Sequence, residues 1–342
     1  MKQLSIVLLL QLGVAVSTLS AQKILFVDSS QTGISFRGLS VVNDKMVWVS
    51  GSKGTIGKSV DGGYSFVWIH PKGFEKRDFR DIEAFDENTA IAMAVDNPGL
   101  IIKTTDGGHS WKVVYEKDLH GMFLDAMCFK NEKRGICVGD PINLRFWIIE
   151  TNDGGDSWQE IPPAFRPTAD SGEACFASSG TNIQFVDDPR FEYGFVSGGY
   201  MSNLYMMGSG RDKSNSIMKL DINHELETTG ANSWAVNGKK YVVLGGDFKD
   251  YKMEMFNSTY SMDGGKRWQS PGYPPAGYKS CVIWKDDKNL IATGLTGTDI
   301  SLKGPKDWEH ISDIQFHVVQ KAKKGSAIFL AGGNGRIGRY VE

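Results

Sequence analysis

The sequence predicts an all-β protein, a seven-bladed β-propeller with four-stranded antiparallel blades. Three observations support this prediction. A short turn-forming phrase recurs along the chain, four short strand-like runs surround each copy, and the final repeat lacks one strand that Lys23–Val27 can supply. Repeats of 40 to 50 residues that each contain four strands are typical of propeller blades.

The repeated phrase, here called the Asp-Gly-Gly turn, occupies Ser59–Phe66, Thr104–Trp111, Thr151–Trp158 and Ser261–Trp268. Its aspartates follow one another after 45, 47 and 110 residues, and the last interval is close to two repeats. An aspartate can accept backbone N–H bonds that close a turn, and glycine permits positive φ. We therefore interpret these residues as structural rather than as metal ligands or catalytic acids. They are Asp61, Gly63, Phe66, Asp106, Gly108, Trp111, Asp153, Gly155, Trp158, Asp263, Gly265, Trp268 and, in a degenerate sixth copy, Trp308.

The first three units each contain four apolar or β-branched runs of strand length. Unit one has Phe36–Val42, Met46–Gly51, Thr55–Val60 and Phe66–Ile69. Unit two has Phe79–Phe85, Thr89–Val95, Leu100–Thr105 and Trp111–Tyr115. Unit three has Phe123–Phe129, Gly135–Gly139, Phe146–Asn152 and Trp158–Ile161.

Units four to seven keep the strands but vary the turn. Unit four has Asn182–Val186, Tyr193–Gly198, Leu204–Gly208 and Ser216–Ile222, unit five spans Ser233–Trp268, and unit six ends in the degenerate Ser301–Trp308. Unit seven offers three strands, and its Ile328–Gly338 mirrors Val47–Gly57 of unit one. We expect Lys23–Val27 to pair into this last blade, because closure removes the exposed sheet edges that promote aggregation. The divergence of unit four leaves six or eight blades as alternatives.

Residues 1–21 are typical of a secretory signal, since Lys2 precedes the apolar run Ile6–Val16 and small residues follow. We therefore expect an exported protein, periplasmic or extracellular, with a single propeller over residues 22–342. A net charge of −2 gives no support for nucleic-acid binding. Cys128 and Cys137 could face each other on adjacent strands, whereas Cys175 and Cys281 fall in units four and six, which argues against direct pairing. Small buried thiols are the alternative.

The starts of the innermost strands indicate a binding face, because propellers usually bind at the mouth of the central channel. Phe36-Arg37-Gly38-Leu39 aligns with Phe79-Arg80-Asp81-Ile82 and with Tyr278-Lys279-Ser280-Cys281, and unit seven offers His317. Arg37, Arg80, Lys279 and His317 are thus the candidate partner-binding residues, and the cations would give this face a positive field. The alternative is local pairing, for example of Arg80 with Asp81 or Glu83.

The Asp-Gly-Gly turn closely resembles the Asp-box (BNR) repeat of the sialidase-like superfamily. Together with Phe36-Arg37-Gly38-Leu39, Trp48–Ile56 and the closing Gly332–Ile337, it resembles the propellers related to the photosystem II stability and assembly factor. That resemblance implies a non-catalytic exported propeller that holds a protein partner, with an arginine patch that Arg37 and Arg80 match. It implies no catalytic residue, cofactor or metal, and we expect a monomer.

The alternative functions are a sialidase-like glycoside hydrolase and a carbohydrate-binding propeller. A hydrolase would need an arginine triad, a nucleophile and an acid/base. Arg37 only half matches the sialidase motif because the proline is absent, and no Tyr/Glu pair can be assigned from the sequence. Glu173, in the long segment Pro162–Glu173, is a lone candidate acid. A carbohydrate-binding propeller would use exposed aromatic residues such as Tyr200 or Tyr273.

Overall fold

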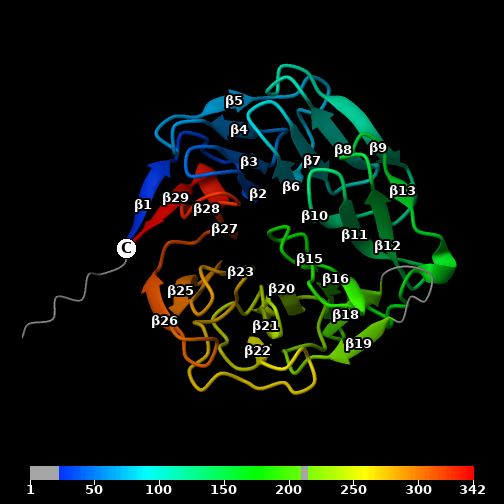
Figure 1. Cartoon of the computed structure of the whole chain (residues 1–342), viewed down its shortest axis with the longest axis vertical. Coiled ribbons are helices and arrows are strands. Elements are labelled where there is room, and N and C mark those ends of the chain that lie inside the picture. Colours follow the sequence, from blue (N-terminus) through cyan, green and yellow to red (C-terminus); the bar gives the residue numbers. More distant parts are fainter. Residues whose placement is uncertain (1–22, 209–214) are drawn as a thin grey trace, which may run out of the picture.

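The computed structural model describes residues 23–208 and 215–342, which form seven antiparallel blades around a central channel (Figure 1). The first blade contains β2 (Phe36–Val41), β3 (Val47–Gly51), β4 (Ile56–Ser59) and β5 (Val67–Ile69). The second contains β6 (Phe79–Ala84), β7 (Ala90–Ala94), β8 (Gly99–Thr104) and β9 (Lys112–Lys117). The third contains β10 (Leu124–Phe129), β11 (Gly135–Ile142), β12 (Arg145–Thr151) and β13 (Gln159–Glu160).

The remaining blades follow the same order from the channel outwards. The fourth contains β15 (Ile183–Phe185), β16 (Phe191–Val196), β18 (Asn203–Gly208) and β19 (Ser216–Lys219). The fifth contains β20 (Thr229–Asn237), β21 (Lys240–Asp247) and β22 (Ser258–Ser261), with a bridge from Tyr260 to Gln269 in the outermost position. The sixth contains β23 (Cys281–Trp284), β24 (Leu290–Gly294), β25 (Gly297–Ser301) and β26 (Glu309–Ser312).

The seventh blade closes the ring. It contains β27 (Val318–Lys321), β28 (Ile328–Ala331), β29 (Ile337–Val341) and the N-terminal β1 (Lys23–Asp28). Strand β1 pairs antiparallel with β29, with Lys23 opposite Val341 (Figure 1). The predicted seven-bladed architecture and its closure are therefore confirmed. The predicted signal segment lies outside the described residues, and within them no helix is long and apolar enough to cross a membrane.

An additional layer lies over blades four and five. The short strands β14 (Glu173–Ala174) and β17 (Gly198–Gly199) add to the sheet of blade five. Strand β17 pairs with the beginning of β20, and β14 pairs with β17. The 3₁₀ helix η1 (Pro163–Phe165) precedes β14, and a second, η2 (Gly333–Gly335), joins β28 to β29. The loops of blades three to five are therefore built up on the channel-mouth face, unlike those of blades one and two.

The hydrophobic core lies between neighbouring blades rather than at the ring's centre. Between blades one and two, Trp48 is fully buried together with Phe79 and Ala92. Burial of an aromatic side chain contributes roughly 2 to 3 kcal/mol, so each such contact holds one blade to the next. Successive side chains of a strand point to opposite faces of the blade. Because both faces are covered, side chains on either face contribute to these contacts.

The aspartate of each Asp-Gly-Gly turn accepts a backbone N–H four residues later and a Ser or Thr hydroxyl two residues earlier. In the first, Asp61 accepts bonds from the backbone N–H and hydroxyl of Ser65 and from the Ser59 hydroxyl, at 2.6 to 3.0 Å. The bonds from Ser65 lower the pKa of the Asp61 carboxyl to about 2. Asp106 and Asp153 repeat this arrangement, and at Asp263 the guanidinium of Arg267 replaces the serine hydroxyl, so the aspartates hold the turns.

The second glycine of each turn also lies against the preceding blade. A Cβ on Gly108 would stand 2.5 Å from Cδ1 of Ile69, and one on Gly155 would stand 2.4 Å from Cδ1 of Ile91. Both glycines have φ near +80 to +92°, which side-chain-bearing residues rarely adopt. In addition, the amine of Lys103 in blade two donates to the carbonyl of Gly154 in the third copy at 2.9 Å. The turns therefore join blades as well as strands.

The four cysteines are free thiols. In blade three Cys137 lies opposite Met127, and Cys128 lies opposite Ile136. The two cysteines are thus one residue out of register, and successive side chains in a strand point to opposite faces. The suggestion that Cys128 and Cys137 face each other is wrong for this reason, and the alternative of small, mostly buried thiols holds.

Candidate partner-binding site at the channel mouth

A cavity of about 320 Å³ lies at the mouth of the channel. Its basic side is lined by Arg37, Arg80 and His317, which come from the starts of the innermost strands of blades one, two and seven. Its aromatic side is lined by Phe123, Phe176, Phe248 and Tyr278. Three of the four residues predicted to line the mouth therefore lie together, and Lys279 does not line this cavity.

In four of the seven blades a β-bulge lies at the start of the innermost strand. The pairing between first and second strands skips Arg37 in blade one, Arg80 in blade two and Asp125 in blade three. The same shift skips Asn232 in blade five. A bulged residue is left out of the ladder and its side chain is redirected. In blades one and two the bulged residues, Arg37 and Arg80, line the cavity.

Lys279 occupies the position before the bulge. Its backbone N–H donates to the carbonyl of Gly245 in the preceding blade, as the N–H of Phe36 donates to Gly332. Phe36 is fully buried, and so is Lys279. The alignment of Tyr278-Lys279 with Phe36-Arg37 was therefore shifted by one residue. Ser280 stands where Arg37 does, and it lines the cavity with Tyr278.

The buried Lys279 has a structural partner. Its amine forms an ion pair with Asp299 of blade six, and neither side chain is exposed. The same amine donates to the hydroxyl of Thr296 at 2.8 Å and the carbonyl of Gly297 at 3.1 Å. These contacts compensate the buried charge of the Lys279 amine, so Lys279 has a structural role in blade six and does not line the mouth.

Arg37 and Arg80 are held close to each other with few internal partners. Arg37 donates to the carbonyl of Ser178 at 3.3 Å, and burial together with the charge of Arg80 lowers the pKa of its guanidinium. Arg80 pairs through Nε with Asp78 at 2.8 Å and lies over the ring of Phe123. Its local partner is thus Asp78, rather than Asp81 or Glu83. A guanidinium has five donors, so most of those on Arg37 remain for a ligand.

His317 adds no charge to the mouth at neutral pH. Burial and the neighbouring Arg37, Arg336 and Arg80 lower the pKa of its imidazole to about 3. Arg336, which donates through Nε to the carbonyl of Gly333 at 2.9 Å, was not among the predicted site residues. Arg336 lies in the closing Gly332–Ile337 segment, which carries part of the family resemblance. Among the residues that line the cavity, the cationic side chains are therefore Arg37 of blade one and Arg80 of blade two.

An acid occupies the same bulge position in blade three. Asp125 is fully buried, and burial and the neighbouring Asp140 raise the pKa of its carboxyl well above the usual range. Asp140 accepts the backbone N–H of Cys175 at 2.9 Å, and burial raises its pKa to about 6. The raised pKa means that burial disfavours the charged form of Asp125.

The aromatic wall joins loops from three blades. The ring centroids of Phe176 and Phe248 lie 5.9 Å apart, and those of Phe248 and Tyr278 lie 6.4 Å apart. The Tyr278 hydroxyl donates to the amide oxygen of Asn232 at 2.8 Å, which fixes the ring. Guanidinium groups opposite rigid aromatic rings suit a ligand that carries a carboxylate beside apolar groups.

Glu173, the lone candidate acid of the long loop, lies elsewhere and is closed off. Its carboxylate accepts bonds from the hydroxyl of Tyr205 at 2.8 and 2.9 Å and from the amide of Asn203 at 2.9 Å. Glu173 is 4% exposed and Tyr205 is 1% exposed. This Tyr/Glu pair anchors the loop to blade four and does not face a space that a glycoside can enter.

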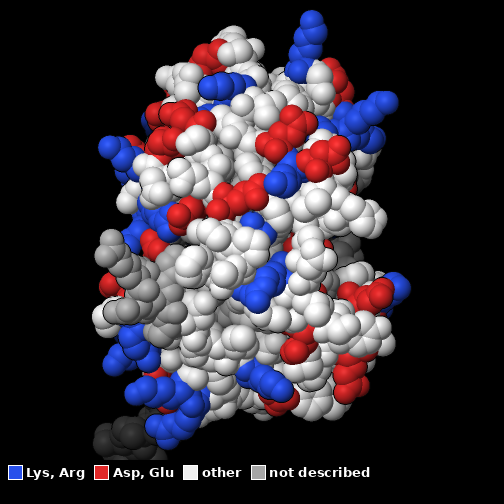
Figure 2. Space-filling view, turned by 90° about the vertical axis from the view of Figure 1, so that its right-hand side faces the viewer, with Lys and Arg blue, Asp and Glu red and all other residues white. Residues whose placement is uncertain are grey.

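Beyond the mouth, the charges on the ring are mixed. Figure 2 shows Lys and Arg interspersed with Asp and Glu over the edge of the ring that faces the viewer. Among the residues that the structure describes, no group of three or more His, Cys, Asp or Glu could hold a metal ion. The fold and the site together define a seven-bladed β-propeller with Arg37 and Arg80 among the residues that line its channel mouth.

Comparison with known proteins supports the same fold. No family model and no curated protein matches the chain. A solved structure described as YCF48 bound to D1 peptide is 16% identical, with a TM-score of 0.64 over 95% of this chain and 96% of that chain. YCF48 from Cyanidioschyzon merolae is 14% identical, with a TM-score of 0.64 over 94% of this chain and 99% of that chain. At these identities the likeness shows the fold alone.

Proposed function

We propose that this protein is an exported, non-catalytic propeller that binds a protein partner through its channel mouth, as an assembly or stability factor does. The observation that carries the proposal is the pair Arg37 and Arg80, which face one cavity with few internal partners. Bringing two cations together in a partly desolvated place costs folding free energy. An anionic group of a partner offsets that cost.

Two further features support a protein partner. The cavity is also lined by Phe176, Phe248 and Tyr278, which supply apolar contact in addition to the arginines. Aromatic and arginine side chains are the residues most enriched at protein interfaces. A solved propeller of the same fold carries a bound D1 peptide, which makes a peptide segment a reasonable form for the ligand.

Export is part of the proposal and rests on residues 1–21, which have the order of charge, apolar run and small residues of a secretory signal. N-terminal sequencing of the protein isolated from its native cells checks this part. We expect the mature chain to begin near Gln22, in the periplasmic or extracellular fraction. An intact Met1 in a cytoplasmic fraction would remove export from the proposal.

The binding test is capture after chemical crosslinking in the native cell envelope, followed by titration of the identified partner with purified protein. We expect Arg37→Gln/Arg80→Gln to lose the partner while circular dichroism and thermal unfolding show a folded propeller. The matched control, Lys112→Gln/Lys266→Gln, removes two exposed charges from outside the mouth and should bind normally. Equal binding by both variants would contradict the proposed site.

A glycoside hydrolase or a carbohydrate-binding propeller remains the alternative function. Turnover of a sialoside or another glycoside reporter by the pure mature protein would replace the binding proposal. Saturable sugar binding without turnover, lost in an exposed-aromatic variant such as Tyr200→Ala or Tyr273→Ala, would support the carbohydrate-binding function instead.

A further inference from the structure

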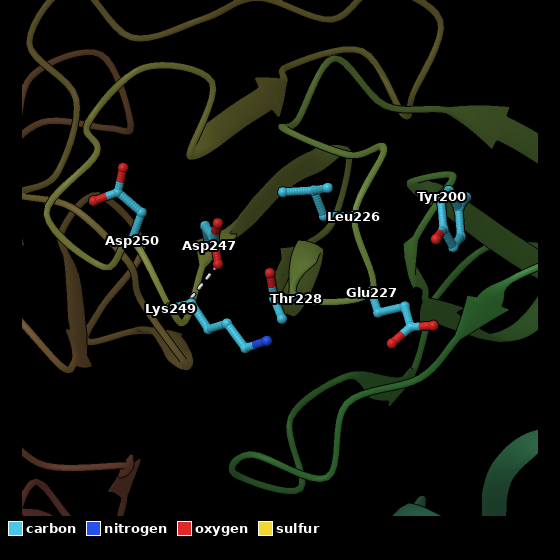
Figure 3. A pocket seen from close by; sticks show the side chains of 7 residues that line it. All are labelled: Tyr200, Leu226, Glu227, Thr228, Asp247, Lys249 and Asp250. Carbon is cyan, nitrogen blue, oxygen red and sulfur yellow. Dashed lines mark hydrogen bonds between the residues drawn. The ribbon is translucent and has the colours of Figure 1, made fainter.

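A second cavity, of about 650 Å³, opens on the loops of blades four and five (Figure 3). It lies between Tyr200, the segment 226–228 that enters β20, and the segment 247–250 that follows β21. All three segments belong to the built-up face that also carries β14 and β17. We refer to this second cavity as the groove.

The groove adjoins the channel mouth through a single residue. Phe248 lines the mouth, while its neighbours Asp247 and Lys249 line the groove. The backbone N–H of Phe248 donates to the carbonyl of Thr228 at 3.2 Å, which ties the two groove loops together. Phe248 is 38% exposed, so it is accessible to a ligand at the place where the linings of the two cavities meet.

Apolar side chains continue from the mouth across this face. Tyr200 is 47% exposed and Leu226 is 55% exposed, and both line the groove. The loop beyond Asp250 presents Met255, 67% exposed, and Phe256, 52% exposed. The backbone N–H of Asn223 donates to the carbonyl of Phe256 at 2.7 Å, so this loop is fixed against the one that bears Leu226. Exposed apolar groups gathered in this way mark interaction surfaces.

The charge of the groove is opposite to that of the mouth. The groove carries the carboxylates of Glu227, Asp247 and Asp250 against the one amine of Lys249. Figure 3 shows Glu227 and Asp250 on opposite sides of Thr228, both exposed. Neither forms an ion pair within residues 23–208 and 215–342. One end of this surface is therefore basic and the other acidic.

We infer that mouth and groove form one polar binding surface for an extended, amphoteric peptide segment of the partner. The peptide's carboxylate lies at Arg37 and Arg80, apolar side chains cross Phe248 and Leu226, and a lysine or arginine lies between Glu227 and Asp250. Opposite charges at the two ends fix the direction of the segment, because the reversed peptide places like charges together. This inference rests on the proposed function and adds the chemistry and orientation of the ligand.

The test is selection from a display library of random twelve-residue peptides on the purified mature protein. We expect enriched peptides to carry Asp or Glu and, at a fixed spacing on one side, Lys or Arg. Binding of a selected peptide should weaken about 3- to 10-fold in Glu227→Gln/Asp250→Asn and when its basic residue is replaced by Gln. When the Glu227→Gln/Asp250→Asn protein is combined with the peptide that lacks its basic residue, the affinity should fall no further than with either change alone. Glu132→Gln/Glu309→Gln, which removes two exposed acids elsewhere, serves as the matched control.

The outcomes separate the two claims. Peptides that are acidic, depend on Arg37 and Arg80, and show no basic preference would overturn the inference and leave the proposed function standing. If the Arg37→Gln/Arg80→Gln variant enriches the same peptides as the wild type, or if no peptide is enriched at all, the result would contradict both the proposed function and the inference. Equal binding of a selected peptide and its reversed sequence would overturn the orientation.

Discussion

Arg37 and Arg80 occupy the same bulge position in neighbouring blades, and the charge of Arg80 contributes to the lowered pKa of Arg37. Repulsion between two cations, with little internal compensation, is a stability cost that the fold alone does not require. The proposed function assigns this pair to partner binding, where an anionic group offsets the repulsion. Functional sites commonly combine desolvation and like charge in this way.

The first prediction concerns that cost. Arg37→Gln removes one of the two cations and leaves a side chain that can still donate to the Ser178 carbonyl. We expect the free energy of unfolding in urea to stay unchanged or to rise by up to about 1 kcal/mol, while partner binding falls. A loss of more than about 2 kcal/mol would show that Arg37 is a structural residue.

The second prediction concerns the buried ion pair. Lys279→Met removes the amine from Asp299 and leaves the ring of His310, at 2.7 Å, as its side-chain partner, and we expect a loss of about 3 kcal/mol in the free energy of unfolding. Lys279→Met/Asp299→Asn should recover part of that loss, because the buried charge is then removed. Urea denaturation measures both. A single variant within about 1 kcal/mol of the wild type would contradict the buried pairing.

The third prediction concerns the contact between blades at the Asp-Gly-Gly turn. Gly155→Ala strains a backbone with φ of +79° and places a Cβ against Cδ1 of Ile91, whereas Gly121→Ala strains φ of +80° with open space around it. We expect Gly155→Ala to lower the free energy of unfolding by about 2 to 4 kcal/mol and Gly121→Ala by about 1.

A second-site change isolates the steric part of that effect. Ile91→Val removes the clashing Cδ1 atom, so Gly155→Ala should cost less in the Ile91→Val background than in the wild type. Thermal unfolding of the four proteins in this cycle gives the coupling energy. Additive effects would mean that Gly155 serves only its own turn.

The fourth prediction concerns pH. Asp81 accepts the backbone N–H groups of Ile82 and Met127 in the channel wall, and burial raises the pKa of its carboxyl to about 7. The folded state therefore holds more protons than the unfolded state from about pH 4 to 7, and the free energy of unfolding falls as pH rises through that window. One such group contributes a slope of up to about 1.4 kcal/mol per pH unit.

The turn aspartates act at lower pH and with the opposite sign. Hydrogen bonds lower the pKa of Asp61 to about 2, so its contribution is present above about pH 4 and is lost as pH falls towards 2. Stability should accordingly be greatest near pH 4 to 5. Urea denaturation between pH 3 and 8 checks this, and Asp81→Ala should flatten the fall above pH 4 relative to Glu132→Gln. Identical slopes in these two variants would refute the assignment to Asp81.

The fold could be predicted from the sequence because its determinants are local and repeated. The Asp-Gly-Gly turns mark the boundary between the third and outermost strands of a blade. Unit seven has only three strands, which indicated that β1 supplies the fourth. Arg37 and Arg80 could be predicted for the same reason, since both follow a phenylalanine that enters the first strand. Their equivalence is visible without any knowledge of the backbone.

Lys279 could not be placed in this way, because a β-bulge leaves no residue signature. Tyr278 resembles Phe36 as an aromatic residue before a cation, yet it is Lys279 that takes the position of Phe36. The groove was missed for a different reason. Its residues Tyr200, Glu227 and Asp250 lie in three loops from non-repeating segments, and only the folded ring brings them together.

The most direct test of the central claim places a photocrosslinker at the mouth. Phe248→p-benzoylphenylalanine positions the crosslinker between mouth and groove, and Tyr64→p-benzoylphenylalanine places it in the first Asp-Gly-Gly turn, where Tyr64 is 87% exposed. After irradiation in the native envelope and mass spectrometry, we expect one protein to be crosslinked at Phe248 and absent at Tyr64. Its crosslink should disappear in the Arg37→Gln/Arg80→Gln background. The same proteins at both positions, or none at Phe248, would contradict binding at the channel mouth.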